Sequence, residues 1–293
     1  SFKDIKGEGY AVVIIDSGID PDHPYFGSDT NRDGMADRII YTKDWNTGGP
    51  ITNSSSERYF SQRSQKYDTT GMHGTHVAGI AASEDIFYPG VAPDANLIVF
   101  DVSIDSADGL NTQAIFDSLD WVSQNYEKYN IVAVNLSLGS SNVVRYKESY
   151  DIADDLARKG VSIVISSGNS FIEDGAGVTQ PGNARNAISV GSLFDKDYSN
   201  RGDILGTIYT ETGPHSAYEI QPYSSRYPGI SDIFAPGTII SAQDKRKPKD
   251  DLEITGTSMA APFITGVIPL LQEVAETYIN RRLSFWEIEK VIK

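Results

Sequence analysis

The fold is decided by the stretch Tyr10-Ala11-Val12-Val13-Ile14-Ile15-Asp16-Ser17-Gly18 of this 293-residue chain. Its first six residues form a continuous apolar run rich in β-branched side chains. Such a run is typical of a strand that is buried on both faces, and therefore of a parallel sheet. The run ends at a carboxylate. Because functional side chains of parallel sheets gather where the strands end, Asp16 is a candidate site residue.

Further apolar runs of the same kind predict more strands along the chain. Between them lie helical patterns, one over residues 112–126 and another over about 144–158. Strands that alternate with helices indicate βαβ units. We therefore expect an α/β fold, with one doubly wound domain over residues 1–293 and a central, mainly parallel sheet flanked by helices. The predicted strands are Leu97–Phe100, Ile131–Val134, Val161–Ile165 and Ala187–Val190.

The composition excludes several classes of protein. The chain carries 40 Asp and Glu against 25 Lys and Arg, a net charge of −15, whereas a nucleic-acid partner requires a basic face. It has no cysteine, which excludes disulfides, thiolate metal sites and a cysteine nucleophile. No apolar run approaches the roughly 18 residues that span a bilayer, so we expect no membrane span.

Two other motifs supply partners for Asp16. The first is His73-Gly74-Thr75-His76-Val77-Ala78-Gly79, and the second is Gly256-Thr257-Ser258-Met259-Ala260-Ala261-Pro262. A serine hydroxyl is a poor nucleophile at neutral pH. An imidazole must take its proton, and a carboxylate must hold that imidazole in the right tautomer. The chain order Asp, His, Ser is one of three unrelated orders in which this geometry recurs.

Each motif also has a non-catalytic explanation. A Gly-Thr-Ser sequence is often only a helix cap, and an aspartate after a strand is often a turn former. The pair of histidines, His73 and His76, has the spacing of some metal ligands, but no Cys or carboxylate signature accompanies it. The presence of all three motifs in one chain favours catalysis.

Together the three motifs resemble those of the subtilisin-like serine proteases (subtilases), over roughly residues 9–292. The resemblance implies a subtilisin-like three-layer sandwich and serine endopeptidase activity. It implies that Ser258 is the nucleophile, that His73 is the general base and that Asp16 orients His73. Asn169, which follows a predicted strand, matches the side-chain donor of the oxyanion hole.

The same resemblance indicates where a peptide substrate binds, with its backbone paired to the enzyme as an added strand. At residues 178–182 an aromatic residue of the relatives is replaced by Gln180, which predicts a shorter pocket and weaker cleavage after large aromatic residues. The residues expected to contact substrate are Ala107, Asp108, Gly109, Ser137, Leu138, Gly139, Ser166, Ser167, Gly168 and Thr179.

A separate motif, Asp29-Thr30-Asn31-Arg32-Asp33-Gly34-Met35-Ala36-Asp37, predicts calcium binding. It has oxygen donors at positions 1, 3, 5 and 9 of an EF-hand-like loop and glycine at position 6. Ile40 stands at position 12 in place of a glutamate, so the match is incomplete, and a polar surface turn is the alternative. The expected ligands of a structural Ca²⁺ are Asp29, Asn31, Asp33, Met35 (through its carbonyl) and Asp37, within an inserted region at residues 27–68.

The resemblance implies further properties. We expect a secreted monomer made as a pro-enzyme that acts on peptides or proteins. Its cleaved pro-segment or a protein inhibitor is a further expected partner. Two alternatives stay open. The acyl-enzyme can pass to a peptide amine, as in a maturation protease or macrocyclase, or the chain is a non-catalytic binding module with this fold.

Overall fold

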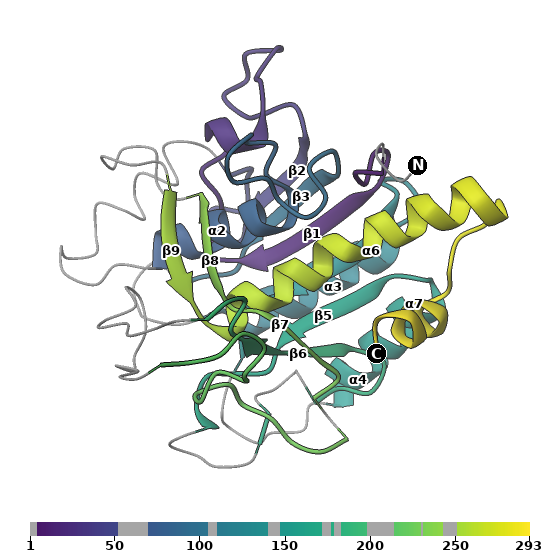
Figure 1. The fold of residues 1–293 in the computed structure, drawn as a ribbon. Coiled ribbons are helices and arrows are strands. Elements are labelled where there is room, and N and C mark those ends of the chain that lie inside the picture. The colour runs from purple at the N-terminus through teal and green to yellow at the C-terminus, as the bar shows by residue number, and fades with distance from the viewer. Residues whose placement is uncertain are drawn as a thin grey trace.

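The computed structural model describes residues 5–51, 70–104, 110–139, 147–171, 177–178, 183–197, 214–229, 231–242 and 251–293. Within them lies a seven-stranded, wholly parallel sheet in the order β2-β3-β1-β4-β5-β6-β7. A two-stranded antiparallel hairpin, β8-β9, stands beside it (Figure 1). The strands are β1 (Ala11–Asp16), β2 (Ile39–Asp44), β3 (Asn96–Asp101), β4 (Ile131–Leu136), β5 (Ser162–Ser166), β6 (Ile188–Leu193), β7 (Ile233–Pro236), β8 (Thr238–Ala242) and β9 (Asp251–Thr255).

Helices cover both faces of the sheet. Those described are η2 (Pro24–Phe26), α2 (Thr70–Ala82), α3 (Thr112–Asn125), α4 (Lys147–Arg158), α6 (Thr257–Ile279) and α7 (Phe285–Ile292). One hydrophobic core joins the sheet to α2 and α6, and a second joins its other face to α3 and α4 (Figure 1). The predicted doubly wound α/β fold with its three layers is confirmed.

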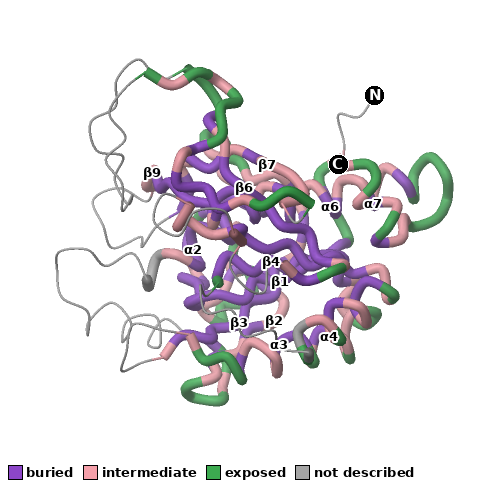
Figure 2. The backbone as a smooth tube through the Cα atoms, turned by 90° about the horizontal axis from the view of Figure 1, so that it is seen from below, coloured by how far each residue is buried: buried purple, intermediate pink, exposed green. Residues whose placement is uncertain are grey.

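Strand β1 shows why the apolar run forms the centre of this arrangement. Val12 and Ile14 belong to the core beneath α2 and α6, whereas Val13 and Ile15 belong to the core beneath α3 and α4. All four side chains are fully buried, and burial of each contributes about 1.5–3 kcal/mol to stability. The strands form the buried middle layer in Figure 2.

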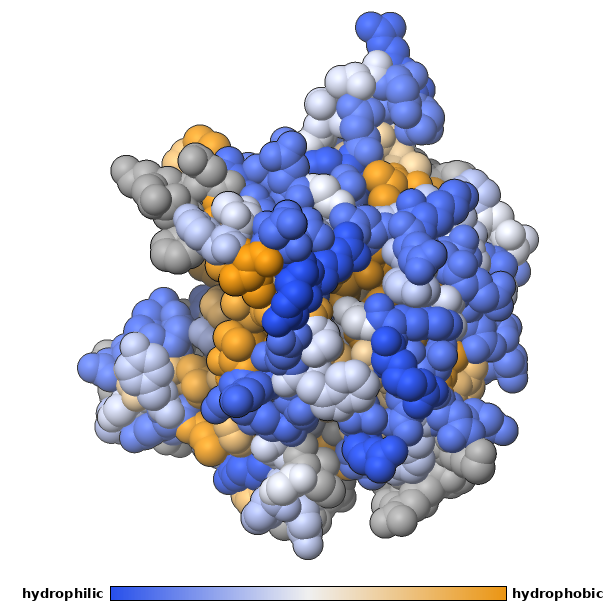
Figure 3. All heavy atoms as spheres, turned by 90° about the vertical axis from the view of Figure 1, so that its right-hand side faces the viewer, coloured by the Kyte–Doolittle hydropathy of each residue, from blue (hydrophilic) through white to orange (hydrophobic). Residues whose placement is uncertain are grey.

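Helix α6 is the one described helix that is long and apolar enough to cross a membrane by length and composition alone. Its apolar 18-residue window is 61% buried inside the protein, and the helix packs across β4, β5 and β6. We therefore assign its hydrophobicity to the core rather than to a membrane span. The face over the end of this helix is mainly hydrophilic, with scattered apolar patches (Figure 3).

Candidate active site

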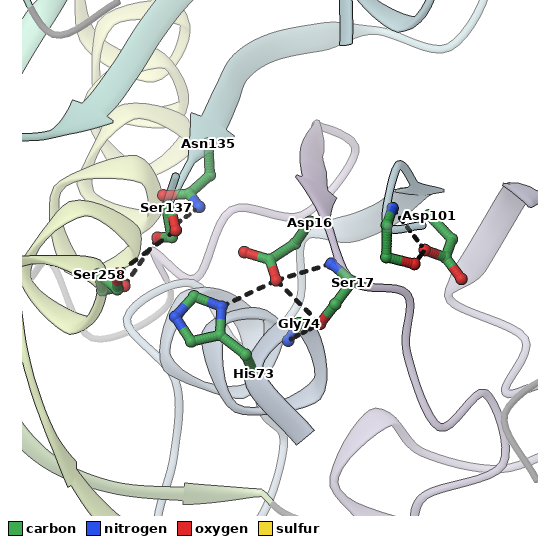
Figure 4. A network of polar contacts seen from close by, with 9 residues as sticks. Asp16, Ser17, His73, Gly74, Asp101, Asn135, Ser137 and Ser258 are labelled. Atoms are coloured by element: carbon green, nitrogen blue, oxygen red, sulfur yellow. Dashed lines mark hydrogen bonds and ion pairs between the residues drawn. The ribbon is translucent and has the colours of Figure 1, made fainter. Parts of the chain in front are cut away.

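The three motif residues come from separate elements that meet at one edge of the sheet. Asp16 is the last residue of β1, His73 lies near the start of α2, and Ser258 lies in the first turn of α6. The close-up in Figure 4 shows the His73 ring between Asp16 and Ser258. This edge is formed by the carboxyl ends of parallel strands, where sites of doubly wound sheets occur.

Asp16 holds the His73 ring by a short hydrogen bond. His73 Nδ1 lies 2.8 Å from Asp16 Oδ1, which also accepts from the Ser17 amide at 2.7 Å and the Ser17 hydroxyl at 3.2 Å. A carboxylate at Nδ1 requires the hydrogen on that nitrogen, which leaves Nε2 as the acceptor. In Figure 4 this second nitrogen lies on the side of Ser258.

Glycine 74 allows this close approach of β1 and α2. A Cβ atom at Gly74 would collide with the carbonyl oxygen of Gly18, in the turn after Asp16. The Gly74 amide donates to the Ser17 hydroxyl at 3.3 Å, so the helix and the aspartate turn are tied directly. The glycine after the motif histidine is thus a steric requirement of the site.

The electrostatics of the pair favour a histidine that can accept a proton. Partial burial of the ring opposes its charged form, but the charge and hydrogen bond of Asp16 outweigh burial and raise the pKa of His73 above its usual value. A raised pKa means that the ring binds a proton more strongly than free imidazole does. This is the property that a general base of the Ser258 hydroxyl needs.

Ser258 forms a reciprocal pair with Ser137, the residue after β4. Among the described contacts, its hydroxyl donates to the Ser137 carbonyl at 3.3 Å, and its own carbonyl accepts from the Ser137 hydroxyl at 2.7 Å. The second bond replaces a helical one, because Pro262 stands four residues later and has no N–H to offer. The Ser258 hydroxyl must leave the Ser137 carbonyl before it can donate its hydrogen to His73.

A buried chain of side chains supports Ser137 from behind. Asn135, at the end of β4, donates from Nδ2 to the Ser137 hydroxyl at 2.9 Å. Its Oδ1 accepts from the Thr265 hydroxyl at 3.1 Å, and Thr265 lies further along α6. Asn135 and Thr265 are fully buried. Ser258 is therefore joined to both the sheet and its own helix.

Asn169 is oriented by Thr257, the residue before Ser258. Its Oδ1 accepts from the Thr257 amide at 3.0 Å and the Thr257 hydroxyl at 2.8 Å, so Nδ2 remains a free donor on the other side. A Cβ atom on Gly256 would lie 3.5 Å from this Nδ2 and 3.7 Å from the Ser258 amide nitrogen. Gly256 therefore leaves open a space that two N–H donors border, as an oxyanion requires.

His76 links helix α2, which carries both motif histidines, to the strand that leads to Ser258. It is fully buried, and its Nε2 donates to the carbonyl of Leu252 in β9 at 2.9 Å. Burial lowers the pKa of His76 to about 4, so the ring is neutral at pH 7. His76 thus fixes β9, and with it Ser258, against the helix that carries His73.

The predicted substrate-contact residues fall into two groups. The structure places six of them at the ends of β4 and β5, where Ser137 contacts Ser258 and the Gly168 amide donates to the Thr257 hydroxyl at 3.1 Å. These six are Ser137, Leu138, Gly139, Ser166, Ser167 and Gly168. Ala107, Asp108, Gly109 and Thr179 lie outside the described residues.

The predicted calcium loop folds as a series of tight turns. The Asp29 carboxylate accepts from the amides of Asp33 at 3.1 Å and Gly34 at 2.9 Å, and the Asp33 carboxylate accepts from the Met35 amide at 3.0 Å. Asp37 accepts from the Thr30 hydroxyl at 2.6 Å. Within the described ranges, no three His, Asp or Glu side chains are gathered as a metal site. Calcium binding at this loop stays a prediction.

Several residues with a part in the site were missed in the sequence. Ser17 and Thr257 lie inside the motifs, next to the residues that they orient. Asn135 lies near the end of an apolar strand, and Thr265 is seven positions after Ser258, on the same side of an α-helix. The sequence did contain a signal for Thr265, because this spacing places a polar residue on the buried face of an apolar helix.

Comparison with known proteins adds evidence on the family. A sequence model described as the subtilase family matches residues 7–291. The chain is 29% identical to serine protease AprX of Bacillus subtilis, over 99% of this chain and 61% of that protein. It is also 29% identical to an alkaline proteinase of Hapsidospora chrysogena, over 92% of this chain and 54% of that protein. The chain thus spans little more than half the length of these two relatives.

Two further comparisons concern a relative of more similar length and a solved structure. The major intracellular serine protease of Bacillus subtilis is 28% identical over 98% of this chain, which covers 75% of that protein. The crystal structure of a cold-adapted subtilisin-like serine proteinase superposes with a TM-score of 0.67, at 23% identity, over 98% of this chain and 82% of the other. This likeness shows the same fold.

We predict that His76 makes the protein acid-sensitive. Because its pKa is lowered to about 4 from 6.5, its contribution to stability is complete above pH 6.5 and is lost as the pH falls toward 4. The lost free energy of unfolding is roughly 3 kcal/mol. Urea unfolding between pH 8 and 4 in a Ser258→Ala background will show this loss, and His76→Asn will reduce it. An unchanged pH dependence in His76→Asn would contradict the prediction.

A second prediction concerns Thr265. Thr265→Val keeps the shape of the side chain but leaves Asn135 Oδ1 without its donor, which costs about 1–3 kcal/mol of stability. We expect kcat to fall and KM to change little, because the chain of hydrogen bonds lies behind the nucleophile. Thr265→Ser, which keeps the hydroxyl, is the matched control. Equal kcat values for the Val and Ser variants would show that the hydroxyl does not position Ser258.

Proposed function

Since the chain belongs to the subtilase family, we propose that it is a serine endopeptidase with Ser258 as nucleophile, His73 as general base and Asp16 as orienting carboxylate. The observation that supports this best is the 2.8 Å contact between His73 Nδ1 and Asp16. The other ring nitrogen, Nε2, lies on the side of Ser258 (Figure 4). Sequence similarity to named serine proteases supports the same activity.

In the proposed reaction, His73 Nε2 takes the proton of the Ser258 hydroxyl as Oγ attacks the carbonyl carbon of the scissile peptide bond. The carbonyl oxygen becomes an oxyanion, which accepts hydrogen bonds from Asn169 Nδ2 and the Ser258 amide. His73 then protonates the leaving amine as the C–N bond breaks. A water molecule attacks the acyl-enzyme by the same steps, and the acid product leaves with Ser258 restored.

Asp16 acts throughout by holding His73. Its charge stabilises the imidazolium that forms when the Ser258 proton is transferred, while the carboxylate itself stays ionised. Ser17 contributes two of the hydrogen bonds on Asp16 Oδ1, so that oxygen is fixed before substrate arrives. Such preorganisation lowers the reorganisation needed in the transition state.

Other expectations remain predictions that follow from the resemblance. Secretion as a pro-enzyme is one of them, and one relative is named an intracellular protease. Transfer of the acyl group to a peptide amine uses the same residues as hydrolysis. Product mass separates the two reactions, because hydrolysis adds water to the peptide and cyclisation does not.

We further propose that the loop at residues 29–37 binds a structural calcium ion. Its donors are all oxygens, the chemistry that Ca²⁺ prefers, and its turns are closed by the carboxylates at positions 1 and 5. The ion would be held by Asp29, Asn31, Asp33, Asp37 and the Met35 carbonyl, and it would stabilise this part of the chain.

For the proposed activity, we predict that a fluorophosphonate forms one adduct, on Ser258, as read by intact mass and peptide mapping. Ser258→Ala will give none, and Asp16→Asn will react roughly 10³–10⁴-fold more slowly, because His73 loses its fixed tautomer. Ser28→Ala, at an exposed serine, is the control and will label as the wild type does. Folded protein that takes no adduct would favour the binding-module alternative.

For calcium, we predict a higher melting temperature with the ion than with a chelator. At a hundred times the dissociation constant the gain is about 2.7 kcal/mol. The double change Asp29→Asn and Asp33→Asn will remove the calcium dependence, whereas Asp94→Asn, at a surface ion pair with Lys6, will keep it. Identical melting curves with calcium and with chelator would overturn the proposal.

A further inference from the structure

Arg226 is fastened to the segment that carries Asn169. The preceding residue, Ser225, donates from its amide to the Gly168 carbonyl at 2.8 Å and accepts at its hydroxyl from the Ser170 amide at 3.1 Å. The two residues that Ser225 bonds, Gly168 and Ser170, are the sequence neighbours of Asn169. The Arg226 backbone is therefore held beside the oxyanion donor, and its side chain is positioned from there.

The guanidinium of Arg226 is held in one place. Its Cζ lies 3.5 Å from the centre of the Phe171 ring, and Nη1 donates to the Ser224 carbonyl at 2.7 Å. A planar guanidinium stacked in this way keeps its remaining N–H groups in a fixed fork, which matches the geometry of a carboxylate. Phe171 is two residues from Asn169, so their Cα atoms are separated by at most about 7 Å.

The charge of Arg226 has no carboxylate partner among the described residues. Other half-buried cations of this acidic protein do have one, as in the pairs of Arg38 with Glu84 at 3.4 Å and of Lys159 with Asp155 at 2.7 Å. Burial lowers the pKa of the Arg226 guanidinium, and no neighbouring acid offsets this effect. A half-buried cation with unused hydrogen-bond donors lowers the free energy of unfolding unless a ligand supplies a negative charge to pair with it.

Arg226 is the one cation in the three described segments that lie next to Ser258 and Asn169. Residues 135–139, 166–171 and 223–229 contain Arg226 as their single Lys or Arg. Because an extended peptide advances about 3.3 Å per residue, a substrate bound across Ser258 and Asn169 would bring residues near its scissile bond within reach of a side chain that is anchored this close to Asn169. The charge that it meets there is positive.

We propose that Arg226 selects substrates that carry a glutamate or aspartate close to the scissile bond. The substrate carboxylate forms a charge-assisted hydrogen-bonded pair with the guanidinium, and Phe171 holds that guanidinium in place. This inference rests on the proposed endopeptidase function and adds a substrate class to it.

The test uses matched peptides that differ at one residue. Fluorogenic peptides carrying Glu, Gln, Leu or Lys at each position from P3 to P2′ are cleaved by the wild-type protein. We expect one position at which kcat/KM for Glu exceeds that for Gln by about 10–100-fold, the range of hydrogen bonds to charged groups. The ratio will fall as salt is added, since the pair is partly exposed.

Variants then assign the preference to this side chain. Arg226→Gln will bring the Glu to Gln ratio close to one, and Arg226→Glu will favour Lys at the same position. Arg185→Gln is the matched control. Arg185 is an exposed arginine that pairs with Asp154 at 3.0 Å. It lies just before β6, at the amino ends of the strands, whereas the candidate site lies at their carboxyl ends. Circular dichroism and melting curves will check that each variant folds.

Two results would overturn the inference. One is equal cleavage of the Glu and Gln peptides at every position, together with normal cleavage of neutral peptides, which leaves the proposed function intact. The other is a Glu preference that survives in Arg226→Gln. If no peptide is cleaved, the proposed function fails instead. Binding of the Glu and Gln peptides to Ser258→Ala then still tests Arg226: tighter binding of the Glu peptide supports the inference, and equal binding overturns it.

Discussion

The hydrogen bond between the Asp16 carboxylate and the His73 ring is the interaction on which the rest of the site depends. It fixes the tautomer of His73, raises its pKa, and requires the end of β1 to touch the start of α2. That contact requires glycine at position 74, because a Cβ atom there would collide with the carbonyl oxygen of Gly18. The sheet supplies rigidity, since β1 is its third strand and is fully buried on both faces.

Ser258, the proposed nucleophile, is positioned by an interruption in the hydrogen bonding of a buried helix. Pro262 removes the amide that would pair with the Ser258 carbonyl, and the Ser137 hydroxyl takes its place. A helix that packs across the core thus becomes attached to the end of β4. Thr257, beside the nucleophile, orients Asn169 in the same way. These hydrogen bonds connect the proposed catalytic groups, which come from distant parts of the chain.

The sequence predicted the centre of the fold better than its edges. The apolar run before Asp16 forms β1, and the predicted helix at 112–126 is α3, which ends one residue earlier, at Asn125. Strands β2 and β7 were missed because they are edge strands with mixed burial, so their residues lack a continuous apolar run. The hairpin β8-β9 was missed because its two strands are separated by residues with no clear turn signal.

For the site, the motifs supplied the proposed reacting groups but not the residues that support them. The bond between Thr265 and Asn135 joins residues 130 positions apart, and the bond between Thr257 and Asn169 joins residues 88 apart. Such partners are set by how strands and helices pack, which local sequence patterns do not encode. Arg226 was overlooked for the same reason, since its position beside Asn169 depends on Ser225 contacting Gly168 and Ser170.

The most direct measurement is a nuclear magnetic resonance titration of His73 in ¹⁵N-histidine-labelled protein, with Asp16→Asn as the comparison. The account predicts that the wild-type His73 carries its proton on Nδ1, titrates above the ordinary pKa of 6.5, and loses both properties when Asp16 is changed. A His73 that titrates at or below 6.5, with the same tautomer in both proteins, would contradict it.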